Sequence, residues 1–214
     1  MKPNILEDLK KAIIGCDAEG SRRAAEEALK EQVDPMEAMN AVTEAIRFVG
    51  GQFEREEIWL PELVGAATAM QQAVPLLEEE IRKRGGEKES IGSVVIGTVK
   101  GDIHSIGKSM VVTLLLAEGF SVHDLGVDVG SQTFIAEIQR VKPELLAMSA
   151  LMTTTSSEMK RVIESLQQQG LREAIKIIVG GAPITEEFAG RIGADGFSAT
   201  APGGARLAAR LAGK

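Results

Sequence analysis

A short polar loop near the middle of the chain carries the side chains with the clearest chemical potential. It reads "GTVKGDIHSIGK", residues 97–108, and follows the β-branched run "SVVI". Asp102 and His104 are two residues apart in this loop, so the carboxylate can accept the Nδ1 proton of the imidazole and leave Nε2 pointing outward. An imidazole oriented in this way is a candidate metal ligand.

The chain offers few other metal ligands of the usual kind. It contains two histidines, His104 and His123, and one cysteine, Cys16, so neither a zinc cage nor an internal disulfide is expected. His123 is interpreted as an incidental strand residue without a partner. A lone oriented imidazole suits a metal that arrives already chelated, such as iron in haem or cobalt in a corrin ring. The protein then supplies one axial bond and a pocket.

The same loop also suggests a nucleotide-binding P-loop, because Gly107, Lys108 and Ser109 follow a strand-like run. A P-loop has four residues between its first glycine and the Gly-Lys pair, but here five residues separate Gly101 from Gly107. The residue at the correct spacing is Asp102, whose carboxylate would repel a phosphate. The spacing therefore excludes a P-loop.

The elements around this loop predict an α/β domain. Apolar runs at 94–96, 122–125, 145–148 and 175–179, with a weaker one at 196–198, alternate with helical stretches. This alternation predicts a parallel sheet with right-handed crossovers. Ligands of such sheets lie beyond the carboxyl ends of the strands, and we expect the loops after the first, third and fourth strands to converge there.

The other two loops have features that structure alone could explain. The second reads "SALMTTTSSEMK" from Ser149, and in it Thr155 and Glu158 can form a capping box for the next helix. The third reads "VGGAPIT", where Gly180 and Gly181 can simply turn the chain after the strand. The glycines also leave space beside that strand. The residues by themselves leave both interpretations open.

The first 88 residues have a helical period instead. "DPME" supplies Asp34 as an N-cap and Pro35 at the first helical position, and Pro61 can open a fourth helix. Helices joined by short loops indicate a bundle. The polar stretch "RKRGGEKES", residues 82–90, has the composition of a linker. We therefore expect a helical domain over 1–88 and an α/β domain over 89–214.

The amino-acid composition argues against two classes of binding partner, nucleic acids and membranes. The chain is 44% hydrophobic and 26% charged, with a formal net charge of −7, which is unfavourable for binding nucleic acid or an anionic membrane. No apolar stretch approaches the roughly 18 residues of a membrane span, and the N-terminus is acidic where a signal peptide would be apolar. A cytoplasmic protein is therefore expected.

Taken together, the three loops resemble the cobalamin-binding domain of B12-dependent methyltransferases and mutases. The resemblance implies a doubly wound, Rossmann-like or flavodoxin-like fold with cobalamin bound base-off/His-on. In that arrangement His104 is the cobalt ligand in place of dimethylbenzimidazole, and Asp102 and Thr155 complete a relay behind it. The nucleotide tail would enter a slot lined by Ser149, Thr153 and the two glycines. The motif residues are Asp102, His104 and Gly107, then Ser149 and Leu151, then Gly180 and Gly181, and the implied cofactor contacts add Gly101, Ile103, Ser105 and Ile106.

Further stretches are similar to the small corrinoid proteins of methanol, methylamine and aryl-ether methyltransferase systems. These are "GFSVHDLGVDV" from Gly119 and "IVGGAPITEEFAGRIGADGF" from Ile178. "QFEREEIWLPEL", residues 52–63, resembles a helical cap in which an aromatic residue, here Trp59, covers the upper face of the corrin. The alternative for Trp59 is a buried anchor of the bundle.

This resemblance implies a methyl carrier that is not catalytic alone. A donor-specific methyltransferase would place a methyl group on cobalt, and an acceptor methyltransferase would pass it to a folate or a thiol. A reductive activator of the corrinoid is a further implied partner. The alternatives are a cobalamin sensor, although no basic DNA-binding segment is present, and an adenosylcobalamin mutase subunit, although such subunits usually lack the cap.

Overall fold

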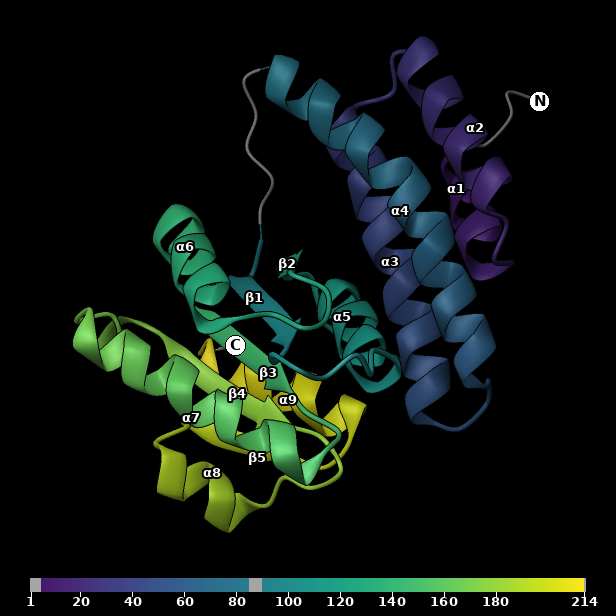
Figure 1. Ribbon diagram of the computed structural model, residues 1–214. Helices are drawn as coiled ribbons and strands as arrows, with labels where there is room; N and C mark the ends of the chain where they lie inside the picture. The colour runs from purple at the N-terminus through teal and green to yellow at the C-terminus, as the bar shows by residue number, and fades with distance from the viewer. Residues whose placement is uncertain (1–4, 85–89, 214) are drawn as a thin grey trace. The chain divides into compact units, whose positions relative to one another are not determined.

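The computed structural model describes residues 5–84 and 90–213. The chain divides into two compact units, Met1–Glu89 and Ser90–Lys214 (Figure 1). The domain boundary expected after residue 88 and most of the expected linker, 82–90, lie outside the described residues.

The N-terminal unit contains four helices within residues 5–84, as the helical period predicts. They are α1 (Ile5–Ile14), α2 (Ala18–Lys30), α3 (Pro35–Glu54) and α4 (Leu60–Lys83). Asp34 caps α3 by accepting a hydrogen bond from the Met36 N–H at 2.9 Å, and Pro35 holds the first helical position. Each helix buries an apolar face, and small residues such as Ala25 and Ala66 allow close packing. The predicted helical bundle is confirmed.

The C-terminal unit is a five-stranded sheet, entirely parallel, in the order β2-β1-β3-β4-β5. This confirms the predicted doubly wound, flavodoxin-like architecture. The strands are β1 (Ser93–Thr98), β2 (Ser121–Asp124), β3 (Leu145–Ser149), β4 (Lys176–Gly180) and β5 (Gly196–Ser198). The helices are α5 (Ile106–Glu118), α6 (Ser131–Val141), α7 (Thr153–Gln168), the 3₁₀ turn η1 (Arg172–Ala174), α8 (Glu186–Ile192) and α9 (Ala201–Leu211).

The two faces of this sheet differ in how tightly they are packed. One face is covered by α6, α7 and α8 (Figure 1), and there Val95, Leu146 and Ile177 join side chains of these helices in a continuous core. On the other face, which α5 and α9 cover, Val94 and Ala147 line a cavity. The difference follows from the strand pleat, because successive residues such as Val94 and Val95 point to opposite faces.

The connection after β1 leads to β2 on one side of the sheet, and the connection after β3 leads to β4 on the other side. This change of direction positions the site. After β1 the chain passes to α5, and after β3 it passes to α7 on the opposite face. The two loops therefore separate at the carboxyl edge and leave a crevice between them. The loop with Asp102 and His104 lies on one side of it, and the loop with Leu151 and Thr155 lies on the other.

Gly97→Ala tests the close approach of β1 to the core. A methyl group at Gly97 would lie 2.8 Å from Cζ of the buried Phe134 ring and 3.3 Å from Val129 Cγ2. We expect a loss of about 1–3 kcal/mol in the free energy of unfolding, measured with urea. The control is Gly190→Ala in α8, where a methyl group meets nothing within 4 Å. It should gain about 0.5–1 kcal/mol, and equal stability of the two variants would contradict this packing.

Candidate functional site

The site is organised around the buried carboxylate of Asp102. Its Oδ1 lies 2.8 Å from His104 Nδ1 and accepts the His104 backbone N–H at 3.1 Å. Its Oδ2 accepts hydrogen bonds from the Leu151 N–H at 2.7 Å, the Thr155 hydroxyl at 2.7 Å and the Met152 N–H at 3.3 Å. One side chain therefore joins the loop after β1 to the loop after β3.

These contacts keep the Asp102 carboxylate ionised. Burial by itself would raise the pKa of the Asp102 carboxyl, but the hydrogen bonds from Leu151, Thr155 and His104 outweigh it and hold that pKa well below the usual range. An ionised carboxylate facing Nδ1 favours the tautomer that carries its proton there. The Nε2 lone pair is then available, and the side chain of His104 is 47% exposed. The imidazole can therefore bind a metal from outside the protein.

Thr155 does not form the capping box that its sequence permits. Helix α7 begins at Thr153 with Met152 as its N-cap, so Thr155 lies inside the first turn and is buried. Its Oγ1 is 2.7 Å from Asp102 Oδ2 and 3.0 Å from Met152 O, and the shorter contact is to the charged acceptor. Glu158 pairs instead with Arg161. The capping-box alternative is therefore wrong.

Sequence reasoning missed Asp128, which holds the backbone of the same loop. Its Oδ1 accepts the Gly101 N–H at 2.7 Å, and its own N–H donates to Asp102 O at 2.9 Å. The residue has φ +55°, a conformation that aspartate tolerates better than most side chains. Thr98 adds a hydrogen bond from its hydroxyl to His104 O at 3.1 Å. The available signal is an acidic residue in the loop after the second strand, whereas the sequence predicts that the loops after the first, third and fourth strands converge on the site.

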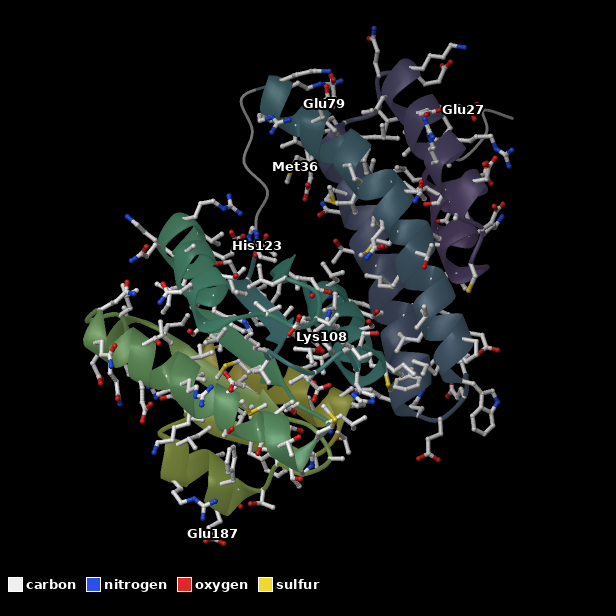
Figure 2. The ribbon with its side chains drawn as sticks, viewed as in Figure 1. Glu27, Met36, Glu79, Lys108, His123 and Glu187 are labelled. Carbon is white, nitrogen blue, oxygen red and sulfur yellow. The ribbon has the colours of Figure 1, made fainter. Side chains whose placement is uncertain are left out.

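An ion pair between the buried Lys108 and the more exposed Asp124 fastens the start of α5 to the end of β2. Lys108, labelled in Figure 2, is almost fully buried, and its Nζ lies 2.5 Å from both carboxylate oxygens of Asp124. Asp124 Oδ1 also accepts the Gly126 N–H at 2.9 Å. Because the lysine follows His104 by four residues, this pair anchors the far end of the histidine loop.

His123 lies on β2 (Figure 2), and its side chain contacts α6. Its Nδ1 lies 3.5 Å from Glu137 Oε1 on α6, and Glu137 also pairs with Arg140 at 2.6 Å. The expectation that His123 has no partner is therefore wrong. Its ring therefore lies beside the Glu137–Arg140 ion pair of α6.

A cavity of about 850 Å³ opens at the carboxyl edge of the sheet, beneath α5 and α9. Gly181 has φ +129°, and a methyl group there would lie 1.8 Å from Ala150 O, so no side chain fits. At Gly180 a methyl group would lie 3.0 Å from Ser198 O. These two glycines therefore allow the chain after β4 to approach the backbone of Ala150 and Ser198 closely. The predicted site residues that line the cavity are Ile103, His104, Ser105, Ile106, Gly107, Ser149, Leu151, Gly180 and Gly181.

The remaining predicted site residues lie elsewhere. Gly101 and Asp102 are not among the residues that line the cavity, and neither is Thr153, which begins α7. Trp59 precedes α4 and is 78% exposed, so the alternative that it is a buried anchor of the bundle is wrong. An exposed indole of this size is available to a ligand or partner.

The surroundings of His104 suit a large, flat, prechelated metal group. Ile103 and Ile106 flank it and are 73% and 71% exposed, and Leu151 and Met152 are also exposed large apolar residues. We call these four residues the apolar collar. In the described parts of the chain no group of three or more His, Cys, Asp or Glu side chains could hold a bare metal ion. One imidazole, the apolar collar and a deep cavity therefore fit cobalamin, whose ring would lie on the collar and whose tail would need a slot.

Comparisons with known proteins agree with this geometry. Residues 92–203 match a family model described as a B12 binding domain, and residues 5–78 match a second model with the same description. Trimethylamine corrinoid protein 1 of Methanosarcina acetivorans is 44% identical over 202 residues, covering 93% of this chain and 94% of the relative. Dimethylamine corrinoid protein 1 of Methanosarcina mazei is 41% identical, covering 94% of this chain and 92% of the relative.

A solved structure is also similar along the chain. It is the crystal structure of the methanol:cobalamin methyltransferase complex MtaBC from Methanosarcina barkeri, which matches with a TM-score of 0.87 and 28% identity. The match covers 100% of this chain and 82% of the matched chain. Separately, the described helices include none that is long and apolar enough to cross a membrane.

Asp102→Asn tests the charge at the centre of the site. A depressed pKa in the folded protein means that Asp102 contributes stability above the ordinary aspartate pKa of about 3.9 and loses that contribution as the pH falls below it. The variant should be about 1.5–3 kcal/mol less stable than the wild type at pH 7. Urea unfolding at several pH values should show this difference shrinking between about pH 5 and pH 2.

The control for this experiment is Thr155→Val, which removes one donor to Asp102 and keeps the carboxylate. It should lose less stability at pH 7 and retain a stability that falls with pH in the acid range. If the stabilities of Asp102→Asn and the wild type fall in parallel down to pH 2, Asp102 is not held as a charged group.

Proposed function

The chain belongs to the family of B12-binding corrinoid proteins, and from that premise we propose that it is a methyl carrier. It accepts a methyl group on the cobalt of its corrinoid from a donor-specific methyltransferase and yields it to an acceptor methyltransferase. The observation that carries this proposal is the half-exposed imidazole of His104, held by the buried Asp102 at the mouth of a deep cavity.

We propose that the corrinoid is held base-off/His-on, with His104 Nε2 as the lower ligand. When bound, the corrinoid supplies a cobalt ion that can take up a methyl group and release it. Asp102 keeps the proton on Nδ1 and so keeps the Nε2 lone pair directed outward.

The cavity is proposed to take the displaced nucleotide tail. Ser149, Ser198 and Thr200 place hydroxyl groups at its carboxyl edge, where a sugar or phosphate would enter. Gly180 and Gly181 line the same entrance. The interior is apolar, as a heteroaromatic base would require.

The relatives support a proposal for the methyl donor. The relatives named for tri- and dimethylamine are more similar in sequence to this chain than the methanol protein is, which favours a methylated amine as the donor.

We assign the unit of residues 1–88 as the cap and Trp59 as its contact with the upper corrin face, supported by the exposed indole. The acceptor is a folate or a thiol, and a reductive activator restores oxidised corrinoid. No observation favours a sensor or a mutase subunit.

The lower ligand can be identified because the chain has only two histidines. The protein is labelled with ¹⁵N-histidine, loaded with cobalamin and reduced to cobalt(II) for electron paramagnetic resonance. The superhyperfine splitting should change from the ¹⁴N pattern to the ¹⁵N pattern. His123→Gln should keep this change, and His104→Gln should abolish it. If the splitting is the same with and without the ¹⁵N label, the lower ligand is not histidine.

The carrier role can be tested by reconstitution. The corrinoid-loaded chain is mixed in its reduced state with purified methyltransferases for trimethylamine, dimethylamine and methanol, and methylation of the corrinoid is followed by absorbance. We expect a rate about tenfold or more higher with a methylamine enzyme than with the methanol enzyme, a difference of about 1.4 kcal/mol in activation free energy. Absence of methylation with every donor enzyme would contradict the carrier role, whereas a faster methanol reaction would change only the donor.

A further inference from the structure

The cavity has a polar mouth and an apolar floor. Its lining residues with hydroxyl, imidazole or ammonium groups all lie at the carboxyl edge, either as the last residue of a strand or in the loops and first helical turns that follow. They are His104, Ser105, Lys108, Ser149, Ser198 and Thr200. Because the strands are parallel, residues earlier in each strand lie deeper. The deeper lining consists of Val94, Ile96, Val111, Leu115, Ala147, Ile178 and Ala208.

The floor also lacks free backbone groups. Val94 and Ile96 lie on β1, which pairs with β2 on one side and β3 on the other. Ala147 lies on β3, between β1 and β4. Peptide groups in such central strands are used by the ladder. The one ammonium group of the lining, Lys108, is paired with Asp124.

We propose that this floor selects the lower base of the corrinoid by polarity. A base with an apolar edge, such as dimethylbenzimidazole, is favoured over a purine such as adenine. The purine would bury ring-edge donors and acceptors without partners, which costs about tenfold in affinity for each group. The inference rests on the proposed function, because it requires the tail to enter this cavity. Val94, Leu115 and Ala208 are the specificity-determining residues.

The test measures equilibrium binding of three corrinoids to the full-length chain without cofactor. These are cobalamin, its adenine-containing analogue, and cobinamide, which has no base. Each dissociation constant is corrected for the fraction of free corrinoid whose base is already off cobalt. After this correction, cobalamin should bind about tenfold or more tighter than the adenine analogue. Equal or tighter binding of the adenine analogue overturns the inference.

Two substitutions connect the preference to the floor. Val94→Thr keeps the shape of the side chain and adds a hydroxyl inside the cavity, so the preference for cobalamin should narrow by about threefold or more. Val95→Thr is the matched control, because Val95 is equally buried but points into the core on the opposite face. It should leave the ratio of affinities unchanged. Ala208→Ser on α9 provides a second floor variant if Val94→Thr does not fold.

The outcomes separate this inference from the proposed function. If both base-containing corrinoids bind more tightly than cobinamide but equally to one another, the tail enters the cavity and the selection by polarity is wrong. If cobinamide binds as tightly as both, the cavity does not hold the tail, and that part of the proposed function fails as well. If neither floor variant changes the ratio, the floor does not set the preference.

Discussion

The structure of the site depends on one buried carboxylate. Removing the charge of Asp102 from water is costly, so the surrounding fold must provide donors in fixed positions. They come from two loops that follow β1 and β3, which diverge toward opposite faces of the sheet. The strand order is thus a condition for the site, because it brings Thr155 within reach of a residue 53 positions earlier. His104 obtains its orientation from this arrangement.

The backbone of the histidine loop is held as firmly as its side chains. Asp128 bonds to residues on either side of the Gly101–Asp102 peptide, and the Lys108–Asp124 pair fastens the first turn of α5. These contacts come from the end of β2 and the loop after it. On the other face of the sheet the core is continuous, whereas the α5 and α9 face retains a cavity. The unit therefore combines a rigid support with room for a ligand.

Local patterns in the sequence were sufficient for much of this organisation. The apolar runs predicted each strand to within about two residues, because strand length and pleat leave a local signature. The two-residue spacing of Asp102 and His104 predicted their contact, because side chains so close along a loop can reach one another. The capping box at Thr155 failed because its hydroxyl has a charged, buried partner that is distant in sequence. Asp128 and the exposure of Trp59 also depend on tertiary packing, which no local pattern reports.

The central claim is that the Asp102 charge sets the tautomer of His104 before any cofactor binds. Long-range ¹H–¹⁵N correlation spectra of ¹⁵N-histidine-labelled protein without cofactor measure this directly, and His123→Gln assigns the signals. At pH values where the ring is neutral, we predict a protonated Nδ1 and a deprotonated Nε2 for His104. In Asp102→Asn this preference should weaken or reverse, because an amide can present its NH₂ group toward Nδ1. A His104 ring protonated on Nε2 in the wild type, or the same tautomer mixture in both proteins, would contradict the account.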